Sequence, residues 1–320
     1  MKKVILYNPS ISTINVGDEI IFQGVYKVLK PILDESYVVN ISTHLPVSYL
    51  FSKIFANADS KFVCGTNLLR NSLGGRFRQW DINFINAKAL GPSTLVGVGW
   101  HNDGKKLTKY TKGLYKKILS HESIHSVRDE YTKERLKKIG FENVVNTGCA
   151  TMWDLTPEFC ETIPNKKAKK VVFTLTDYNK NPHQDKKIIE ILNKEYEEVY
   201  LWLQGWGDYD YAKSIDILDK VKVIAPNLQS YYNFLSDYYV DYIGTRLHGG
   251  IRALQYGKRT MIFAVDNRAM EKKKDFNLPV ESRKDITQEQ LLKIIHCERK
   301  TEIVIPQKNI LLWKKAHGII

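Results

Sequence analysis

Residues 238–268 (YYVDYIGTRLHGGIRALQYGKRTMIFAVDNR) carry the pattern that most restricts the fold of this chain. The stretch opens with an alternating run rich in aromatic and β-branched residues and closes with a second apolar run at 260–265, so a strand is predicted at each end. Between them, apolar residues recur every three or four positions from 247 to 254, and Gly257 stands where a left-handed helix cap belongs. The order strand, helix, strand predicts a parallel sheet.

The start of this helix is predicted to bind an anion. Arg246 and His248 follow the turn Gly244-Thr245 at the carboxyl end of a strand, where open α/β sheets bind ligands and helix N–H groups attract negative charge. Arg252 adds a third potential donor one turn later. The pair Gly249-Gly250 weakens a helix by about 1 kcal/mol per residue relative to alanine, so we expect a close approach to this backbone. The alternative is an ordinary capped helix in which His248 is a packing residue.

The same alternation of short apolar runs and amphipathic stretches extends along the chain and predicts parallel sheets covered on both faces. The first half is predicted to hold strands at 4–7, 37–41, 61–64, 94–98, 124–127 and 143–145, with helices at 18–33, 105–119 and 129–139. The second half adds strands at 171–176, 199–203 and 221–224 and helices at 184–196, 287–295 and 309–316.

A polar stretch divides these two sets of elements. Residues 161–170 (ETIPNKKAKK) contain few apolar side chains, and they are our candidate linker. We therefore predict an α/β protein with two Rossmann-like domains, at 1–160 and 161–305, facing each other across a cleft. The last residues, 306–320, are predicted to form a helix that could fold back on the first domain.

Polar residues follow several of the predicted strands. Asp18 stands at the first helix, where it could be a helix cap or a carboxylate base, and Asn15 precedes it. Asn67 and Trp100 follow two further strands. Arg128 ends another strand just before Asp129, the expected N-cap of a helix; it could reach a ligand or form an ion pair with a neighbouring aspartate. We expect these loops to share the carboxyl edge of a sheet.

The net charge of the chain indicates which partners it can bind, and its cysteines indicate the redox state of its cellular compartment. The formal net charge is +13, from 48 Lys and Arg against 35 Asp and Glu, which suits phosphates, acidic glycans or an anionic membrane surface without choosing among them. The four cysteines are widely spaced and form no C-x-x-C pair, so we expect a reducing compartment and no metal site. No stretch approaches the ~20 apolar residues of a membrane span. We expect a cytoplasmic protein that could touch a membrane without crossing it, with no nucleic-acid partner; its oligomeric state is left open.

The motifs occur in an order that resembles the polysaccharide pyruvyl transferase family, and the resemblance covers most of the chain. The most specific of them is the Arg-x-His helix start with an aspartate after the next strand. One departure is Thr147-Gly148-Cys149-Ala150, where many members have a turn of the Asp-Pro-Ala type. The motifs that carry the resemblance are Asn15-x-Gly-Asp18, the Gly65 loop, Ser126-x-Arg128-Asp129, and Gly244-Thr-Arg246-Leu-His248 followed by Asp266.

The resemblance implies a GT-B-like fold, phosphoenolpyruvate as co-substrate without a further cofactor, and ketal transfer to a sugar of a surface polysaccharide or its lipid-linked oligosaccharide precursor. It implies catalytic roles for His248, Arg246 and Asp18, donor contacts from Arg128, Thr245, Gly249, Arg252 and Asp266, and acceptor contacts from Asn15, Asn67 and Trp100. His248 would protonate the methylene carbon or assist the departure of phosphate, and Asp18 or Asp129 would be the base. The same residues also suit a GT-B glycosyltransferase with a nucleotide-sugar donor. A third alternative, suggested only by the charge, is a non-catalytic binder of acidic glycan or nucleic acid.

Overall fold

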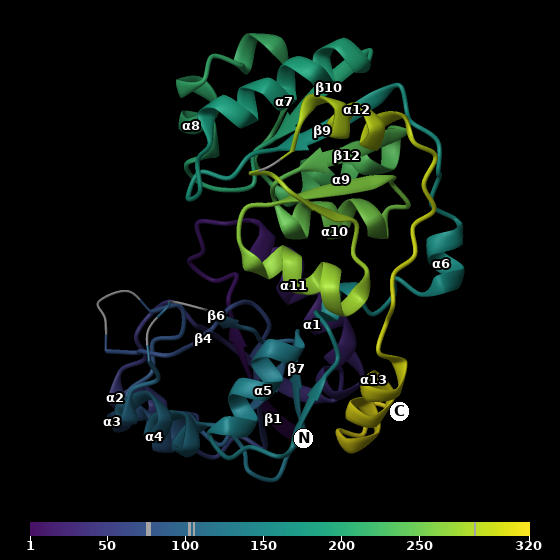
Figure 1. The fold of residues 1–320 in the computed structure, drawn as a ribbon. Coiled ribbons are helices and arrows are strands. Elements are labelled where there is room, and N and C mark those ends of the chain that lie inside the picture. Colours follow the sequence, from purple (N-terminus) through teal and green to yellow (C-terminus); the bar gives the residue numbers. More distant parts are fainter. Residues whose placement is uncertain (75–77, 102–103, 105, 285) are drawn as a thin grey trace. The chain divides into compact units, whose positions relative to one another are not determined.

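The computed structural model describes residues 1–74, 78–101, 104, 106–284 and 286–320, with the side chain of Asn267 left out (Figure 1). Contacts divide the chain into two compact units. Unit 1 comprises Met1–Thr13, Ile21–Trp153 and Pro306–Ile320, and unit 2 comprises Ile14–Ile20 and Asp154–Ile305. Helix α1 (Gly17–Leu33) therefore has its first four residues in unit 2 and the rest in unit 1.

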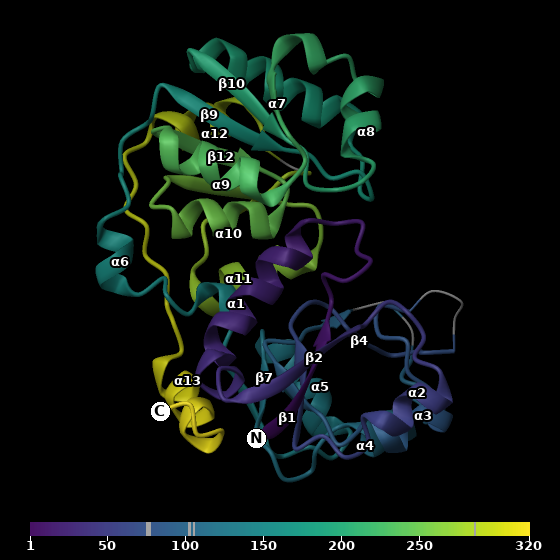
Figure 2. The same ribbon diagram turned by 180° about the vertical axis from the view of Figure 1, so that it is seen from behind.

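Unit 1 is built on a four-stranded parallel sheet in the order β2-β1-β3-β5, seen from both sides in Figures 1 and 2. Ile5 pairs with Val39 on one side and with Lys61 on the other. Two short parallel pairs, β4 with β6 and β7 with β8, extend the unit. The strands are β1 (Lys2–Asn8), β2 (Ser36–Ser42), β3 (Ser60–Cys64), β4 (Leu69–Arg70), β5 (Thr94–Val96), β6 (Trp100–His101), β7 (His125–Val127) and β8 (Val144–Asn146).

The helices of unit 1 cover this sheet over an apolar core that includes Val63, Leu95, Leu114 and Phe141. α2, α3 and α4 lie side by side in both views. The last helix belongs to the same unit, where Trp313 Nε1 donates to Ile124 O at 2.9 Å. Besides α1 they are α2 (Tyr49–Ile54), α3 (Phe84–Leu90), α4 (Lys109–Ile118), α5 (Glu130–Lys138), a 3-10 turn (Ala150–Met152) and α13 (Gln307–Ala316).

Unit 2 holds a six-stranded parallel sheet in the order β11-β10-β9-β12-β13-β14. Because β9 lies in the middle, the chain moves outward first through β10 and β11 and then returns to build β12, β13 and β14 on the other side. The carboxyl ends of β9, β10 and β12 are therefore neighbours at the point where the strand order reverses, which is the usual ligand-binding position. The strands are β9 (Lys170–Thr174), β10 (Glu198–Trp202), β11 (Lys222–Ile224), β12 (Val240–Gly244), β13 (Thr260–Ala264) and β14 (Val280–Ser282).

Helices cover both faces of this second sheet, with α7, α8 and α12 on one face and α9, α10 and α11 on the other (Figure 1). The buried strand residues are almost continuously apolar, as expected for a sheet covered twice. The helices are α6 (Pro157–Glu161), α7 (Pro182–Glu195), α8 (Asp208–Ser214), a 3-10 turn (Leu218–Lys220), α9 (Leu228–Asp237), α10 (Leu247–Gln255), α11 (Asn267–Phe276) and α12 (Gln288–His296).

These sheets confirm the predicted α/β class with parallel strands, and three details differ from the sequence prediction. β5 ends at Val96 and not at residue 98, because Gly97 adopts a left-handed φ of 63° that stops the strand. The expected helix over 105–119 begins only at Lys109, and Lys105 lies outside the described residues. Several short elements, α2, α3, α6, α8, α9 and α11 among them, were not predicted, because each is too short or too irregular in apolar spacing to show a helical period. None of the described helices has the length and apolar character needed to cross a membrane.

Candidate functional site

The turn between β12 and α10 places Arg246 at the N-cap of α10 and His248 in its first turn. The backbone before it is fixed by β9, since Thr245 N donates to Thr174 O at 3.0 Å and Thr245 Oγ1 lies 2.8 Å from Thr176 Oγ1. His248 is half-buried. The predicted strand, turn and helix are thus present, although the helix begins one residue later than expected, at Leu247. Arg246 and His248 both lie at the carboxyl edge of the sheet.

Arg246 is a buried ion-paired residue. Its guanidinium donates from Nε to Leu175 O at 2.7 Å and from Nη2 to Asp177 Oδ1 at 2.7 Å, and Nη2 also bonds Asp208 Oδ1. Burial acts to lower the pKa of Arg246, but Asp208, Tyr178 and Asp177 together outweigh it and raise that pKa, so the group stays charged. Arg246 is only 4% exposed, so its main role in the structure is to hold the strand ends together.

Gly205 makes room for that guanidinium. A Cβ on Gly205 would overlap Arg246 Nη2. Gly205 N and Gln204 N also donate to Asp208 Oδ2, at 2.7 and 3.1 Å. Asp208 is the first residue of α8 and is fully buried, and it joins the end of β10 to the start of α10. Sequence reasoning missed Asp208, since a single aspartate after a Gly-Trp-Gly turn has no distinctive spacing.

The glycine pair of α10 is approached closely, as the sequence predicted. A Cβ on Gly250 would lie 2.5 Å from Ile262 Cγ1, so this glycine allows α10 to pack closely on β13. A Cβ on Gly249 would lie 3.0 Å from Gln204 Oε1 and 3.2 Å from the Tyr242 hydroxyl. The close approach is real, but it is made by the protein's own side chains.

Gln204, at the end of β10, organises the motif Asn15-x-Gly-Asp18. Its Nε2 donates to Asn15 Oδ1 at 2.8 Å, and its carbonyl accepts from Val16 N at 2.9 Å. A Cβ on Gly17 would lie 2.5 Å from Gln204 Nε2, which explains the glycine. Asn15 Oδ1 also accepts from Gly17 N at 3.1 Å, so Asn15 fixes the first turn of α1. Asp18 is then a buried residue in that first turn and not the N-cap.

A second guanidinium lies at the same strand ends. The ring of Tyr178, after β9, has the Arg246 guanidinium 5.3 Å from its centroid and the Arg268 guanidinium 5.5 Å from it. Arg268 is paired with the N-cap of α11, Asp266, through Nε at 2.8 Å, and it also bonds the Tyr178 hydroxyl. The side chains of Arg268 and Asp266 are each about a third exposed, at 35% and 32%. Arg268 was not among the predicted site residues, although it stands two positions after the predicted Asp266.

An exposed tryptophan projects from the loop that follows β10. Trp206 is 84% exposed, yet its backbone is fixed, because Trp206 N donates to Ile14 O at 2.9 Å and Gly205 bridges to Asn15. It immediately follows the glycine that lies against Arg246. A large apolar ring held in solvent at the edge of this cluster is suited to contact a ligand.

Arg128 and Asn67 form a separate cluster within unit 1. Arg128 Nη2 donates to Asn67 Oδ1 at 2.8 Å, and Nε contacts Asp129 Oδ2 at 3.3 Å. A Cβ on Gly99 would overlap Arg128 Nε. Asp129 is the N-cap of α5 and accepts from Thr132 N at 2.8 Å, so its carboxylate is already occupied. The ion pair with Asp129 is thus the arrangement that the structure shows.

Two other predicted site residues, Trp100 and Arg252, pack against aromatic rings. Trp100 is buried in the core of unit 1, with its ring 5.6 Å from that of Tyr115 and its Nε1 donating to Asn71 Oδ1 at 3.2 Å. The Arg252 guanidinium lies 4.6 Å over the ring of Tyr232 on α9. Burial lowers the pKa of Arg252. Both side chains are therefore engaged within their own unit.

A model of the polysaccharide pyruvyl transferase family matches residues 15–267. This chain belongs to that family. Family membership implies a transferase that acts on a polysaccharide. The matched range runs from the Asn15 motif through the residue that follows Asp266, and so includes every residue of the cluster except Arg268 and Ile14. No curated protein sequence matches the chain.

Solved structures similar to this pyruvyl transferase family member share its fold at low identity. A Staphylococcus aureus MnaA–UDP structure has a TM-score of 0.52 at 11% identity, covering 100% of this chain and 98% of its own. The Methanocaldococcus jannaschii UDP-GlcNAc 2-epimerase has a TM-score of 0.55 at 13% identity, with the same coverage. A putative UDP-N-acetylglucosamine 2-epimerase from Listeria monocytogenes has a TM-score of 0.55 at 12% identity, covering 99% and 94%. These neighbours confirm the predicted GT-B-like two-domain fold.

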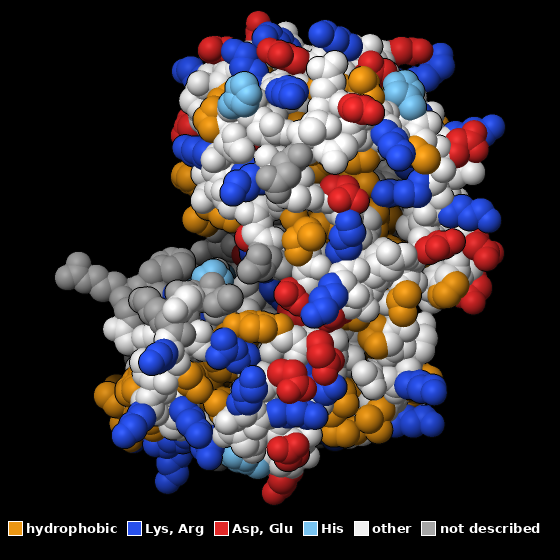
Figure 3. All heavy atoms as spheres, viewed as in Figure 1, with side chains coloured by type: hydrophobic (Ala, Val, Ile, Leu, Met, Phe, Trp, Pro, Cys, Tyr) orange, Lys and Arg blue, Asp and Glu red, His pale blue; other side chains and the backbone are white. Residues whose placement is uncertain are grey.

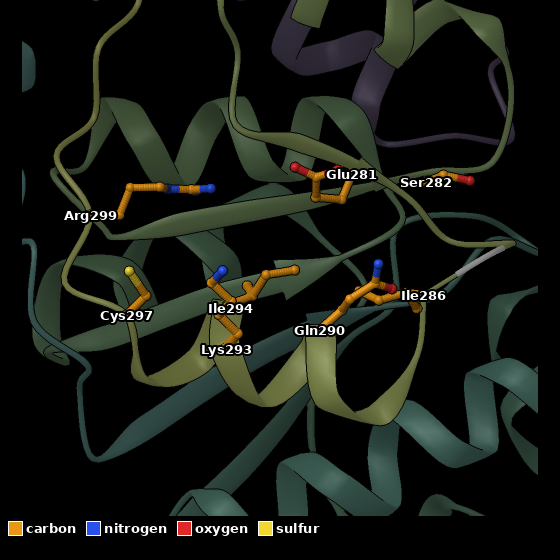
Figure 4. A pocket seen from close by; sticks show the side chains of 8 residues that line it. All are labelled: Glu281, Ser282, Ile286, Gln290, Lys293, Ile294, Cys297 and Arg299. Atoms are coloured by element: carbon orange, nitrogen blue, oxygen red, sulfur yellow. The ribbon is translucent and has the colours of Figure 1, made fainter.

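A pocket of about 400 Å³ lies elsewhere in unit 2 of this pyruvyl transferase family member, between the edge strand β14 and α12 (Figure 4). Among the described residues, none of the predicted site residues lines it. Within the same described set, no group of three or more His, Cys, Asp or Glu side chains could hold a metal ion. The pocket is lined by Glu281, Ser282, Ile286, Gln290, Lys293, Ile294, Cys297 and Arg299.

Proposed function

We propose that this family member transfers a pyruvyl group from phosphoenolpyruvate to two hydroxyls of a sugar in a surface polysaccharide or its lipid-linked precursor. The supporting observation is the pair of guanidinium groups, Arg246 and Arg268, on the ring of Tyr178 beside the start of α10. Phosphoenolpyruvate carries a phosphate and a carboxylate, and planar guanidinium groups match both anions.

In this proposal Arg268 makes the more direct donor contact. Its side chain is about a third exposed and its partner Asp266 is similarly exposed, so an incoming anion can replace that carboxylate. Arg246 is held by the buried Asp208, and a donor oxygen would meet its Nη2 only by displacing Asp177, whose side chain is 25% exposed. Arg246 therefore acts mainly by fixing the strand ends that carry the donor site.

His248 is proposed as the acid. In ketal formation the two hydroxyl oxygens form bonds to the central carbon, the carbon–oxygen bond to phosphate breaks, and the methylene carbon gains a proton. The two hydroxyls lose two protons in total. One proton is accounted for by the methylene carbon, which becomes a methyl group, and the other leaves with phosphate. An imidazole in the first turn of α10 can deliver the proton to carbon, and histidine is the side chain most often used for such proton transfers.

Asp18 is proposed as the base for the sugar hydroxyl. Asp18 lies in the first turn of α1 beside the Asn15–Gln204 bond and belongs to the same unit as His248, whereas Asp129 belongs to unit 1 and caps α5. Burial and the charge of Asp18 both raise the pKa of the neighbouring Glu19, so this helix start concentrates negative charge. Trp206 would pack against the apolar face of the acceptor sugar.

Two parallel incubations test the proposal. The protein and a repeat-unit glycan acceptor are supplied with phosphoenolpyruvate in one and with nucleotide sugars in the other, and released phosphate, released nucleotide and acceptor mass are measured. We expect phosphate release and an acceptor that is heavier by a ketal-linked pyruvate. Nucleotide release with no phosphate would instead indicate a glycosyltransferase and overturn the proposal. His248→Gln should lower phosphate release by at least ~100-fold with an unchanged circular dichroism spectrum.

A further inference from the structure

Helix α2 of unit 1 has its apolar side chains on the outside. Leu50 is 75% exposed and Ile54 is 68% exposed, whereas Ser52 is fully buried and bonds back to Tyr49 O at 2.8 Å. Soluble helices normally show the opposite arrangement, with polar residues in water and apolar residues in the core. Tyr49 and Phe51 of the same helix are also exposed.

The two neighbouring helices also expose apolar side chains, although they bury others, Leu90 and Leu114 among them, in the core of unit 1. In α3, Ile85 is 70% exposed and Phe84 is also exposed, while Asn86 is buried and donates to Val47 O at 3.3 Å. In α4, Tyr110 is exposed and Thr111 is buried. Contiguous exposed apolar surface of this kind marks an interaction site in a folded protein. We call the outer surface of α2, α3 and α4 the α2–α4 face.

This face is attached to the sheet of unit 1 by hydrogen bonds from β3. The buried amino group of Lys61, on β3, donates to Ala89 O at 3.0 Å, Gly91 O at 2.7 Å and Ala56 O at 3.3 Å, which holds the ends of α2 and α3. The Phe84 ring lies 5.1 Å from the ring of Tyr110 in an edge-on contact, which joins α3 to α4.

The charge on the face has one sign. The three helices contain six lysines and no aspartate or glutamate, and all six lysines are exposed. Lys53 Nζ lies 4.5 Å over the ring of Tyr49, and Lys117 Nζ lies 5.5 Å over the ring of Phe84, so amino groups stand directly above the apolar side chains. Figure 3 shows hydrophobic and basic side chains together over α2, α3 and α4, at the lower left. The lysines are Lys53, Lys88, Lys109, Lys112, Lys116 and Lys117.

We propose that the α2–α4 face docks on an anionic lipid surface, with Leu50, Phe51, Ile54 and Ile85 entering the region between headgroups and acyl chains and the lysines contacting lipid phosphates. Exposed aliphatic and aromatic side chains beside lysines, without acidic residues, are the combination that binds anionic membranes at their interface. The long lysine stems lie along the apolar surface while the amino groups reach the phosphates.

Charge argues against a second copy of this chain on this face, and the aliphatic side chains argue against a nucleic acid. A second copy of this chain would pair the same face with itself, as in a two-fold dimer, and would bring six lysines against six lysines. A single-stranded nucleic acid would stack on aromatic rings, but Leu50, Ile54 and Ile85 are aliphatic and are among the most exposed residues of the face. Hydrocarbon is the environment that suits them.

Vesicle co-sedimentation tests the proposal without any substrate, so its result is independent of the proposed enzyme activity. The full chain is mixed with vesicles of phosphatidylcholine alone and of phosphatidylcholine with phosphatidylglycerol, at low and high salt. We expect binding to the anionic vesicles only, weakened by salt. The triple variant Leu50→Ser, Phe51→Ser, Ile54→Ser should bind at least ~10-fold more weakly, because it removes most of the inserted apolar surface.

The same unit supplies a matched control in α13, which exposes Leu311 and Leu312 next to Lys314 and Lys315 but buries Ile310 and Trp313 in the normal way. Leu311→Ser with Leu312→Ser should leave vesicle binding unchanged. Lys109→Gln with Lys112→Gln should weaken binding to anionic vesicles and reduce its salt dependence. The proposal is overturned if the triple variant binds like the unmodified protein, if only the α13 variant loses binding, or if sedimentation without lipid shows a dimer that the triple variant dissociates.

Discussion

Asn15 accepts a hydrogen bond from Gln204 at 2.8 Å, and this side-chain contact helps to join the residues before α1 to the loop after β10. The two residues are far apart in sequence, one in the amino-terminal loop and one after the second strand of unit 2. Together with the backbone bonds from Val16 N to Gln204 O and from Trp206 N to Ile14 O, this bond explains why residues 14–20 group with unit 2. Asp18 therefore belongs to the same unit as Arg246 and His248.

Replacing Gln204 by leucine should loosen the start of α1. The side-chain bond to Asn15 is lost while the backbone bond from Val16 N remains, so we expect a loss of about 1 kcal/mol in the free energy of unfolding. Hydrogen exchange at the amides of Gly17 and Asp18 should become faster. Gln229→Leu is the control: it removes an exposed side-chain bond to Asn233 on α9 and should cost only a few tenths of a kcal/mol. Equal effects of the two variants would contradict the role of Gln204.

Arg246 and Arg268 should respond differently to replacement by methionine. Arg246→Met leaves the buried carboxylate of Asp208 without its cation, and we expect a loss of about 3–5 kcal/mol in urea unfolding. Adding Asp208→Leu should recover part of that loss. Arg268→Met breaks a pair that is a third exposed and should cost at most about 1 kcal/mol, while it raises the KM for phosphoenolpyruvate. A stable Arg246→Met protein would show that the Asp208 pair is not structural.

Gly99→Ala should destabilise unit 1. The added methyl group overlaps the Arg128 guanidinium and lies 2.7 Å from Asn67 Oδ1, so Arg128 must leave its place between Asn67 and Asp129. We expect a loss of about 1–3 kcal/mol, the usual cost of overpacking. Gly74→Ala, where the nearest atom is Ser72 Oγ at 4.0 Å, should change stability by no more than about 0.5 kcal/mol. Thermal unfolding of both variants checks the difference.

Trp206→Ala should weaken acceptor binding and leave stability almost unchanged. The ring is 84% exposed, so its removal takes little buried apolar area from the fold. Loss of one stacking contact should raise the KM for the glycan roughly 5- to 10-fold, with kcat little affected. Tyr239→Ala is the control, since this exposed ring precedes the amino end of β12, at the opposite edge of the sheet. If both variants show the same KM for the acceptor, Trp206 has no part in binding it.

The stability of the protein should fall as pH drops from about 6.5 to about 4, because of His125. Burial lowers the pKa of this histidine from 6.5 to about 4. Its Nδ1 accepts from Leu95 N at 3.1 Å and its Nε2 lies 2.8 Å from Ser120 O, an arrangement that requires the neutral ring. Below pH 6.5 the unfolded chain binds a proton that the folded protein does not, so up to about 1.4 kcal/mol is lost per pH unit until the folded ring is protonated.

Urea unfolding at a series of pH values measures that slope. The variant His125→Asn should be less stable at neutral pH but should lose less stability between pH 6.5 and 4. Carboxylates contribute mainly at the acid end of this range, so the comparison of slopes above pH 5 isolates the histidine. Identical slopes in the two proteins would exclude His125 as the source.

The strands and long helices could be predicted from the sequence because their patterns are local. The unit around α10 shows this: the alternation before Gly244, the helical spacing from residue 247 and Gly257 with its φ of 67° each depend on neighbouring residues only. For the same reason the position of His248 in a first helical turn was predictable. The short helices α2 and α3 were not, because their outward face is apolar and carries no helical period that could be recognised.

The partners of the charged residues were decided by the tertiary structure. Arg246 could be assigned to the edge of a sheet from the sequence, but nothing in the sequence shows that Asp208 and Asp177 come to it from the ends of two other strands. Likewise, the glycines at 99, 205 and 250 fit close contacts with Arg128, Arg246 and Ile262, which are distant in sequence. The sequence by itself determined which segments become strands and helices and which polar residues stand at strand ends, since both follow from periodicity along the chain. Only the tertiary structure decided which of those residues are neutralised by a buried partner and which remain accessible, because burial and ion pairing depend on strand order in the sheet.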